Sequence, residues 1–309
     1  MYGGAHPLAM VSSIATSPAV DLSRLPAPNI ISQPDFEVRR GAKIARLTGL
    51  LPVFTAIVES DPAIKLIEAD SYDEMILAQG FNDAARSMLL AFATGGSLDH
   101  LGALMDVARL TLTTANVQTG AAAVMEGDDD YRRRILIAPH SFSVAGPELA
   151  YVYHARSASA DVVDASATSP SPGVVIVSIL SRTVTGAASP ATITAVDAVL
   201  NHEAVRPLTD FVTVQSADIV NFNILADLYL YFGPDAGLIM QTAMAGLTAY
   251  LTENRRLGRD ITRAGIIAAL KVAGVQNVIL TAPAADLILT PLQCGYAANV
   301  TVNNAGNVE

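Results

Sequence analysis

The sequence predicts an α+β protein: an N-terminal helical region built around one long bundle helix, followed by two small α+β domains. Apolar residues recur at three- and four-residue steps in the first third of the chain, whereas alternating β-branched runs separate shorter helical patterns afterwards. A chain of 309 residues with 51% hydrophobic content can fill more than one core. We expect an extended arm at 1–33, a helical bundle region at 34–120, a middle α+β domain at 121–217 and a C-terminal α+β domain at 218–309.

Two helices are expected in the bundle region. The first runs from Pro34 to Leu50. The second begins at Asp61 and Pro62, where proline suits the first helical position, and can continue to Ala93. A helix of that span is a rod of roughly 45 Å. The proline-rich arm before these helices shows no helical period.

The second helix carries an apolar stripe with the spacing of a buried helix face. Its members are Met75, Ala78, Phe81, Ala85, Met88 and Phe92. Four more apolar residues lie off the stripe: Ile76, Leu77, Leu89 and Leu90. Much of the helix circumference is therefore apolar and must be covered on several sides. Either a locally complete helical core or a second chain provides that cover, and the sequence leaves both readings open.

Shorter segments connect the bundle helix to the middle domain. Gly95 and Gly96 are expected to end the long helix, and Ser97 to cap the short helix SLDHLGALMDVA. Residues 107–125 are expected to form a strand and a loop. The segment GDDDYRRRILIA predicts a helix whose three aspartates stand four residues before three arginines, a stabilising order. We expect no metal site there, because no EF-hand spacing follows.

Strand and helix patterns alternate in the middle domain. ADVVDASATS and GVVIVSIL are expected to be strands joined by the turn SPSPG. A helix is expected from Ser189 and Pro190 to near Asn201, followed by the strand DFVTVQSA.

A second α+β unit follows. NFNILADLYLYF is expected to be a strand, and the next helix closes at Arg255, Arg256 and Gly258. Thr262 is a plausible cap for a further helix. VQNVILTAP and YAANVTV complete the unit as strands.

Composition excludes several functional classes. The net charge of −10 argues against a general nucleic-acid binder or a protein that binds anionic membranes. One cysteine, Cys294, rules out a disulfide within the chain and disfavours a cysteine-based metal site. The N-terminus lacks the pattern of a signal peptide, and no apolar run is long enough to span a membrane. Arginine far outnumbers lysine, which fits protein interfaces or a GC-rich genome.

The stretch HSFSVAGPELAYVYHARSA, residues 140–158, is the best candidate for catalysis. On its predicted helix Glu148, Tyr151 and His154 lie three residues apart along one flank, with Ser143 before them. A hydrolase using Ser143, Glu148 and His154 is the alternative function. However, Ser143 is not in a Gly-x-Ser-x-Gly turn, and the spacing is not His-Glu-x-x-His. Gly146, Pro147 and Glu148 instead fit a helix start, and we favour a structural role.

No other segment offers a catalytic or cofactor motif. GGSLDHLG is not a dinucleotide-binding fingerprint, and no Walker loop is present. The basic segment 255–263 is a possible phosphate or nucleic-acid site, but a capped helix junction explains it without a ligand. We therefore expect no catalytic residue, no cofactor and no metal, and a component of an assembly rather than an enzyme.

Eight blocks in order resemble the baseplate J-like family, the J-type baseplate proteins of contractile-tailed phages and phage-tail-like bacteriocins. They are VDLSRLPAPNII at 20–31, NDAARSMLLAFATGGSLDHLGALMDVARL at 82–110, AVMEGDDDYRRRI at 123–135, FSVAGPELAYVYHARSA at 142–158, ATSPSPGVVIVSILSR at 167–182, VRPLTDFVTVQ at 205–215, LGRDITRAGIIAALKVAGVQNVIL at 257–280 and PAADLILT at 283–290. The resemblance covers the chain from about Asp21 onward and carries no catalytic residues.

The resemblance implies a structural wedge protein of the tail baseplate, assembled in the host bacterial cytoplasm. Its implied partners are further copies of the chain, paired within and between wedges, a smaller I-type tail protein, a lysozyme-like W-type wedge protein and other baseplate components. Neither nucleic acid nor a membrane anchor is implied. The interface and family-motif candidates are Met75, Phe81, Met88, Phe92, Gly95, Leu98, Asp99, Leu101, Gly102, Gly146, Pro147, Tyr151, Arg206, Pro207, Gly258, Arg259 and Asp260.

Overall fold

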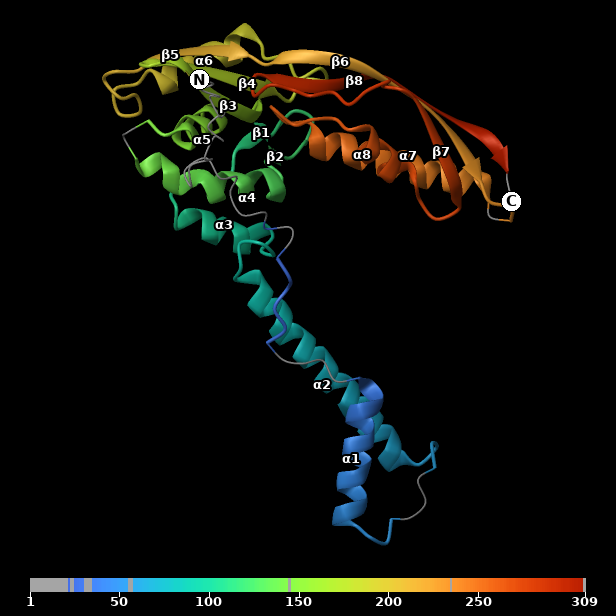
Figure 1. Cartoon of the computed structure of the whole chain (residues 1–309). Helices are drawn as coiled ribbons and strands as arrows, with labels where there is room; N and C mark the ends of the chain where they lie inside the picture. Colours follow the sequence, from blue (N-terminus) through green and yellow to red (C-terminus); the bar gives the residue numbers. More distant parts are fainter. Residues whose placement is uncertain are drawn as a thin grey trace, which may run out of the picture. The chain divides into compact units, whose positions relative to one another are not determined.

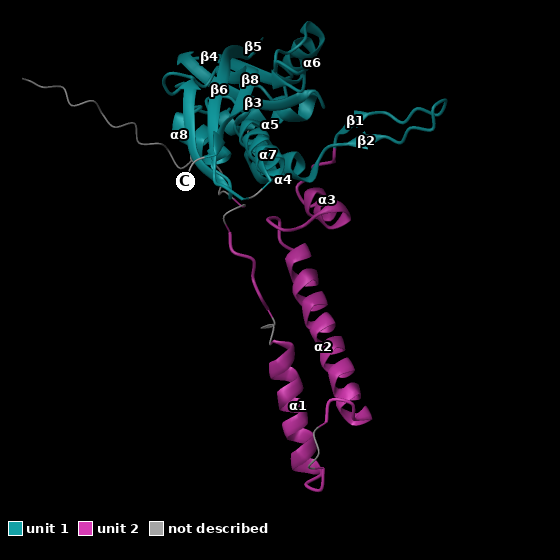
Figure 2. Ribbon diagram, turned by 90° about the vertical axis from the view of Figure 1, so that its right-hand side faces the viewer, with its two compact units in different colours: residues 1–17, 110–309 teal, residues 18–109 magenta. Residues whose placement is uncertain are grey.

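The computed structural model describes residues 22, 25–30, 35–54, 58–143, 146–233 and 235–307. It divides into two compact units, 18–109 and the remainder, coloured separately in Figure 2. Residues 18–109, unit 2 in the key of Figure 2, are the helical unit. The unit that follows it in the chain, unit 1 in that key, is called the second unit and holds the sheets (Figure 1), so the predicted α+β class is confirmed. Most of the predicted arm lies outside the described residues. Its last part bonds to the helical unit, where Asn82 Oδ1 accepts from the Ile30 amide at 3.0 Å.

The helical unit contains α1 (Phe36–Leu50), α2 (Pro62–Ser87) and the short α3 (Gly95–Ala103). Asp35 and Asp61 cap α1 and α2, because their side chains accept from the amides two residues later. A short connection joins α1 to α2, and the two helices run side by side in opposite directions (Figures 1 and 2). They form a helical hairpin.

The long helix is shorter than predicted. It ends at Ser87, whose hydroxyl bonds to the Ala84 carbonyl at 2.7 Å, and not at Ala93. The following amides bond three residues back, as in Phe92 N–H to Leu89 O at 2.9 Å, so a series of tight turns replaces the helix. Met88 and Phe92 therefore lie beyond α2. The two glycines expected to end that helix instead begin α3, where Gly95 has φ +52°.

A projecting hairpin of β1 (Thr111–Thr113) and β2 (Val124–Met125), visible in Figure 2, leads from the predicted bundle region into the middle domain. Its main sheet has the order β3-β4-β5, with β3 (Val162–Ser171) antiparallel and β5 (Phe211–Ser216) parallel to β4 (Val174–Ser181). The helical elements are α4 (Asp128–Ile137), the 3₁₀ turn η2 (Ala138–Phe142), α5 (Glu148–Ala158) and α6 (Pro190–Leu200). Side chains of α5 and α6 pack with those of the sheet in one apolar cluster.

The charge pairs on α4 differ from the predicted four-residue pattern. Asp129 and Asp130 pair with the arginines three residues later, at 2.6 Å to Arg132 and 3.7 Å to Arg133. Arg134 turns inward to Glu126, at 2.7 Å, and both side chains are at most 3% exposed. The local pattern could not reveal this partner because Glu126 precedes the helix.

The C-terminal domain has the sheet order β7-β6-β8, in which β6 (Asp218–Leu230) is antiparallel to β7 (Val275–Ala282) and parallel to β8 (Gln293–Asn307). The helices α7 (Ala236–Asn254) and α8 (Arg263–Leu270) cover one face of it (Figure 1). Thr262 caps α8 as expected, accepting from the Gly265 amide at 3.1 Å. Alternate residues of β6 are buried against these helices.

The two α+β domains are tied together within their unit. Only Ala217 separates β5 from β6, and its amide bonds to the Ile179 carbonyl at 2.9 Å. Ala217 packs with Leu180 and Cys294 in a small apolar cluster, where burial raises the pKa of the Cys294 thiol to about 11. The Leu257 amide donates to Asp164 Oδ2 at 3.1 Å. Backbone and side-chain bonds thus fix one domain to the other.

Candidate assembly surface

The structure does not pair Glu148 with His154, two of the alternative hydrolase residues. Glu148 and His154 lie on α5 and form no hydrogen bond with each other, and the ring of His154 contacts Tyr153 at 5.4 Å. Desolvation raises the pKa of Glu148 and lowers that of His154, so burial explains both shifts without a charged partner. Within the described ranges, no three His, Cys, Asp or Glu side chains are grouped closely enough to hold a metal.

The basic segment 255–263 serves the fold. Arg255 donates to the carbonyls of Thr183 and Val184, and Arg263 donates to the carbonyls of Leu280 and Pro283. These side chains tie the helix junction to the neighbouring backbone. No helix in the described part of the chain has the length and apolarity needed to span a membrane.

Ion pairs connect the two helices of the hairpin. Arg39 lies 2.9 Å from Glu74, Arg40 lies 3.1 Å from Glu68, and Lys43 contacts Glu74 at 2.9 Å. Hydrogen bonds lower the pKa of Glu68, mainly from Lys65, and that of Glu74, mainly from Lys43. Partly exposed ion pairs contribute little to stability but favour one pairing of helices.

The hairpin buries very little apolar surface of its own. No residue of α1 is buried, and α2 buries Ile64, Ser71, Ala78 and Asn82. Seven-residue steps link Ile64 to Ser71 and Ala78, which marks the seam toward α1. Two of these four residues are polar, so the seam cannot supply the core that a helical domain needs.

The opposite side of α2 is apolar and exposed. At about 3.6 residues per turn, these side chains point away from the seam of Ser71 and Ala78. They are Leu66, Tyr72, Ile76, Leu77 and Phe81, between 54% and 72% exposed. We name these five residues the α2 outer face. The predicted stripe combined two surfaces, because Ala78 lies in the seam whereas Phe81 lies on the outer face.

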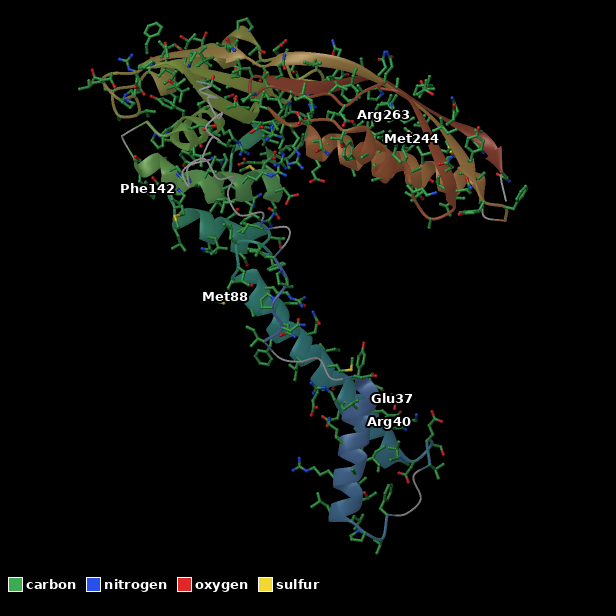
Figure 3. The ribbon with its side chains drawn as sticks, in the orientation of Figure 1. Glu37, Arg40, Met88, Phe142, Met244 and Arg263 are labelled. Carbon is green, nitrogen blue, oxygen red and sulfur yellow. The ribbon has the colours of Figure 1, made fainter. Side chains whose placement is uncertain are left out.

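Further apolar residues extend the exposed surface. Leu50, Leu51, Val53 and Val58 are exposed at the turn between α1 and α2. Met88, labelled in Figure 3, is 75% exposed just after α2. Exposed apolar side chains in this number mark an interaction site in a soluble protein.

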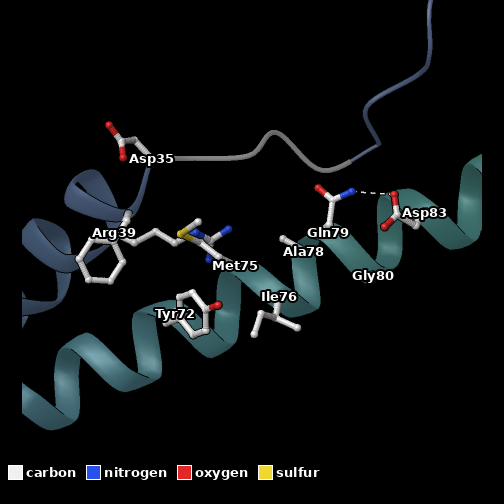
Figure 4. A pocket seen from close by; sticks show the side chains of 10 residues that line it. Asp35, Arg39, Tyr72, Met75, Ile76, Ala78, Gln79, Gly80 and Asp83 are labelled. Carbon is white, nitrogen blue, oxygen red and sulfur yellow. Dashed lines mark hydrogen bonds between the residues drawn. The ribbon is translucent and has the colours of Figure 1, made fainter.

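A groove of about 620 Å³ lies beside the α2 outer face, between the start of α1 and the middle of α2 (Figure 4). Its lining combines apolar and charged side chains: Asp35, Phe36, Arg39, Tyr72, Met75, Ile76, Ala78, Gln79, Gly80 and Asp83. Met75, a predicted interface residue, lines this groove. The apolar floor with charged rims suits a side chain presented by another helix.

Other predicted motif residues in the helical unit stabilise α3. Leu98 and Gly102 are buried, and Asp99 forms an ion pair with Arg109 at 2.8 Å. Leu101 is half-buried. These positions therefore hold the short helix and its following segment in place.

In the middle domain, the predicted motif residues form a corner. Gly146 has φ +71°, and a Cβ there would lie 2.7 Å from Pro207 Cγ, so only glycine fits. Tyr151 donates to Asp210 Oδ2 at 2.6 Å, and desolvation together with this bond raises its pKa. Pro147 caps α5. Arg206, beside this corner, donates to Asn201 Oδ1 at 3.4 Å.

In the C-terminal domain the motif residues hold the turn before α8. The Gly258 amide donates to the Gln293 carbonyl at 2.9 Å, with φ +66° at the glycine. Arg259 donates to Asn254 Oδ1 at 2.9 Å, and Asp260 Oδ1 accepts from the Leu289 amide at 2.7 Å. These three residues cross-link a loop.

Sequence reasoning missed part of the exposed surface. Leu66 and Tyr72 were not candidates, although both belong to the α2 outer face. The eleven-residue step from Leu66 to Leu77, about three helical turns, was the available signal. Glu126, the buried partner of Arg134, left no local signal.

Comparison with known proteins gives matches along most of the chain. The Baseplate J-like N-terminal domain matches residues 59–116, the Baseplate J-like central domain residues 143–216, and the Baseplate J-like protein C-terminal domain residues 222–303. The chain is 45% identical over 301 residues to Baseplate protein J of Escherichia phage P2. That alignment covers 94% of this chain and 100% of the relative.

Proposed function

From the premise that this chain belongs to the baseplate J-like family and is a structural protein of a phage tail baseplate, we propose that it is a wedge protein. In this proposal the helical hairpin joins a smaller I-type tail protein and a second copy of the chain in a helical bundle. The unit that follows links adjacent wedges into a ring around the tail tube, beside a lysozyme-like W-type neighbour.

The α2 outer face is the observation that carries this proposal. Five apolar side chains, spread over the half of the α2 circumference that does not face the seam, are more than half exposed, while the seam toward α1 is narrow and partly polar. Burying them would remove a large apolar area from water, which is the main driving force of association. Helices from other chains, packed against both sides of α2, would complete the bundle.

Ring formation by the second unit is supported by its rigidity. The two α+β domains share the continuous β5–β6 run and the contacts around Ala217 and Cys294. Two domains tied together in this way would transmit a change of contacts from one wedge to the next. Contraction of the tail sheath would then follow when the contacts between wedges switch from one packing to another.

Co-expression with the I-type partner tests the bundle. Phe81→Asp places a carboxylate on the α2 outer face, and we expect co-purification with the partner to be lost. Met88→Asp is expected to have the same effect if the bundle extends past α2. Recovery of an intact complex with Phe81→Asp, at normal expression, would contradict the proposal.

Phe232→Asp is the matched control. Phe232 is 64% exposed and Phe81 is 63% exposed, so the two substitutions change the same residue type at equal exposure. Phe232 lies after β6, in the other unit. We expect Phe232→Asp to leave the complex with the I-type partner intact, which separates an effect of the bundle from a general loss of solubility.

A further inference from the structure

The edge strand β8 lacks the features that normally protect a sheet edge. It is 15 residues long, and its sequence QCGYAANVTVNNAGN contains no charged residue and no proline. Long edge strands usually carry charges, prolines or a covering segment, because their unpaired backbone groups can pair with another chain. Figure 1 shows β8 at the margin of its sheet.

The other edge of the same sheet is protected. Two carbonyls of β7 accept bonds from charged side chains: Leu280 O from Arg263 at 2.8 Å, and Gln276 O from Lys271. Arg263 is labelled in Figure 3. Among the described residues, no side chain from outside β8 bonds to its backbone between Tyr296 and Ala305. Charged side chains thus bond to the backbone at the β7 edge of the sheet, but not at the described part of its β8 edge.

The bonding pattern identifies the free groups of β8. The bond from the Asp218 amide to the Leu292 carbonyl shows which residues of β6 bond to β8. Further along, Ala298 is an extra residue in β8, and Ile224 then pairs with Val300. In a parallel ladder, the backbone amides and carbonyls of every second residue bond to the neighbouring strand. The amides and carbonyls of the residues between them point to the other side. The amides and carbonyls of Val300 and Val302 therefore point outward from the sheet.

The sequence of β8 is self-complementary around Thr301. Residues 299–303 read Asn-Val-Thr-Val-Asn, the same in both directions. In an antiparallel pair of identical strands centred on Thr301, Thr301 faces Thr301, Val300 faces Val302 and Asn299 faces Asn303 of the second copy. The outward groups of Val300 and Val302 then exchange hydrogen bonds directly, and no charge opposes another.

Two side-chain hydrogen bonds order the face of β8 on which Thr301 lies. Asn299 donates to Asn223 Oδ1 at 3.0 Å, and Asn303 donates to Asp227 Oδ1 at 2.9 Å. Both amides are fixed on either side of Thr301, on the face of the sheet away from α7 and α8. Ordered side chains lose less entropy when a second strand docks.

We propose that two copies of this chain pair through β8, antiparallel and around a two-fold axis at Thr301, to form one six-stranded sheet with the order β7-β6-β8-β8-β6-β7. The inference rests on the proposed function in that it names the surface through which copies pair. A two-fold contact between identical surfaces is also the commonest symmetry of soluble assemblies.

Charge exchange at Thr301 tests the pairing in the purified full-length chain. Thr301→Lys and Thr301→Asp each place like charges opposite one another, so we expect either variant alone to self-associate about tenfold more weakly or worse. An equimolar mixture of the two variants should regain association, because lysine then faces aspartate. Sedimentation over a wide concentration range measures all three samples.

Thr281→Lys is the matched control on the protected strand. Thr281 is exposed on β7, and the same charge there should leave association unchanged. Circular dichroism confirms that each variant is folded. Undiminished association of Thr301→Lys, a mixture that regains nothing, or a wild-type chain that stays monomeric throughout would each overturn the proposal. Retention of I-type binding by Phe81→Asp would contradict the proposed bundle and leave these measurements unaffected.

A disulfide provides a second readout. Facing residues in a non-hydrogen-bonded antiparallel pair have Cα atoms about 4.5 Å apart, within the range that a disulfide spans. Thr301→Cys should therefore give a covalent dimer under mild oxidation, whereas Thr281→Cys should not. The natural Cys294 is buried and does not compete. Absence of the covalent dimer with Thr301→Cys would also overturn the proposal.

Discussion

Strand β6 and helix α2 use apolar residues in opposite ways. In β6, five alternate residues are buried under α7 and α8, and Leu228 is 0% exposed. In α2, only four of 26 residues are buried, and Leu77 is 63% exposed. A leucine side chain is therefore part of a complete core in β6, whereas on α2 it stays exposed. Completeness of burial, rather than hydrophobicity, separates residues needed for folding from residues needed for assembly.

Charged groups show the same contrast. The hairpin uses partly exposed pairs such as Arg39 with Glu74, whereas the second unit buries Arg134 and Glu126 almost completely. Exposed pairs can be broken and remade at little cost, but a buried pair leaves a desolvated charge when one partner is removed. The second unit thus contains an ion pair that is costly to break, whereas the two helices of the hairpin are joined by pairs that are broken at little cost.

The largest effect is expected from breaking the buried pair. Arg134→Met leaves the Glu126 carboxylate, 2% exposed, without its cation, and should lower the free energy of unfolding by about 3–5 kcal/mol. Urea unfolding followed by circular dichroism measures the change. The matched variant Arg39→Met should cost less than about 1 kcal/mol. Equal losses in the two variants would remove the distinction between the regions.

Replacing one leucine by alanine in β6 and one in α2 tests whether the buried leucine matters more for folding than the exposed one. Leu228→Ala opens a cavity in the core and should lower the free energy of unfolding by about 2–5 kcal/mol. Leu77→Ala should change it by no more than about 0.5 kcal/mol in the isolated chain, yet weaken binding of the I-type partner. Thermal unfolding and a pull-down provide the two measurements. A strongly destabilised Leu77→Ala chain would mean that the α2 outer face is already covered within the chain.

A smaller loss is expected at the corner of the middle domain. Tyr151→Phe removes the bond to Asp210 Oδ2, 2.6 Å in length, and keeps the ring in place. We expect a loss of about 1.5–3 kcal/mol, because the acceptor is a carboxylate. Urea unfolding measures it, with Tyr72→Phe on the exposed helix face as the control. A neutral Tyr151→Phe would show that Gly146 and Pro207 hold the corner without this bond.

The local signals of the sequence predicted most elements. Ser189 and Thr262 cap α6 and α8 as expected, and the alternating runs became strands. The end of α2 was wrong because the apolar period continues past Ser87, while the backbone there bonds three residues back. Hydrophobic spacing carries no information about that local choice.

The candidate surface was predictable only in outline. Apolar residues around the whole circumference of α2 indicated that cover was needed, but not which side α1 supplies. That choice involves Ser71, a polar residue buried in the seam, and ion pairs that cross from another helix. The partner of Arg134 was equally hidden, because a contact between separate elements leaves no period in the sequence.

The smallest effect concerns the pH dependence of the hairpin. The pKa values of Glu68 and Glu74 lie below their ordinary value of 4.5, so their pairs stabilise the hairpin above that pH and are lost as pH falls further. Although desolvation opposes it, bonds to Asp70 and Glu74 raise the pKa of Lys43 above 10.5, so its contribution is lost only at still higher pH. Hydrogen exchange of the α1 amides should therefore show weaker protection below about pH 4.5 in low salt, and less pH dependence in high salt. Lys43→Gln should weaken the loss of protection below about pH 4.5, since Glu74 then loses its main partner. A pH profile of protection identical to that of the wild-type chain would show that the seam alone pairs the two helices.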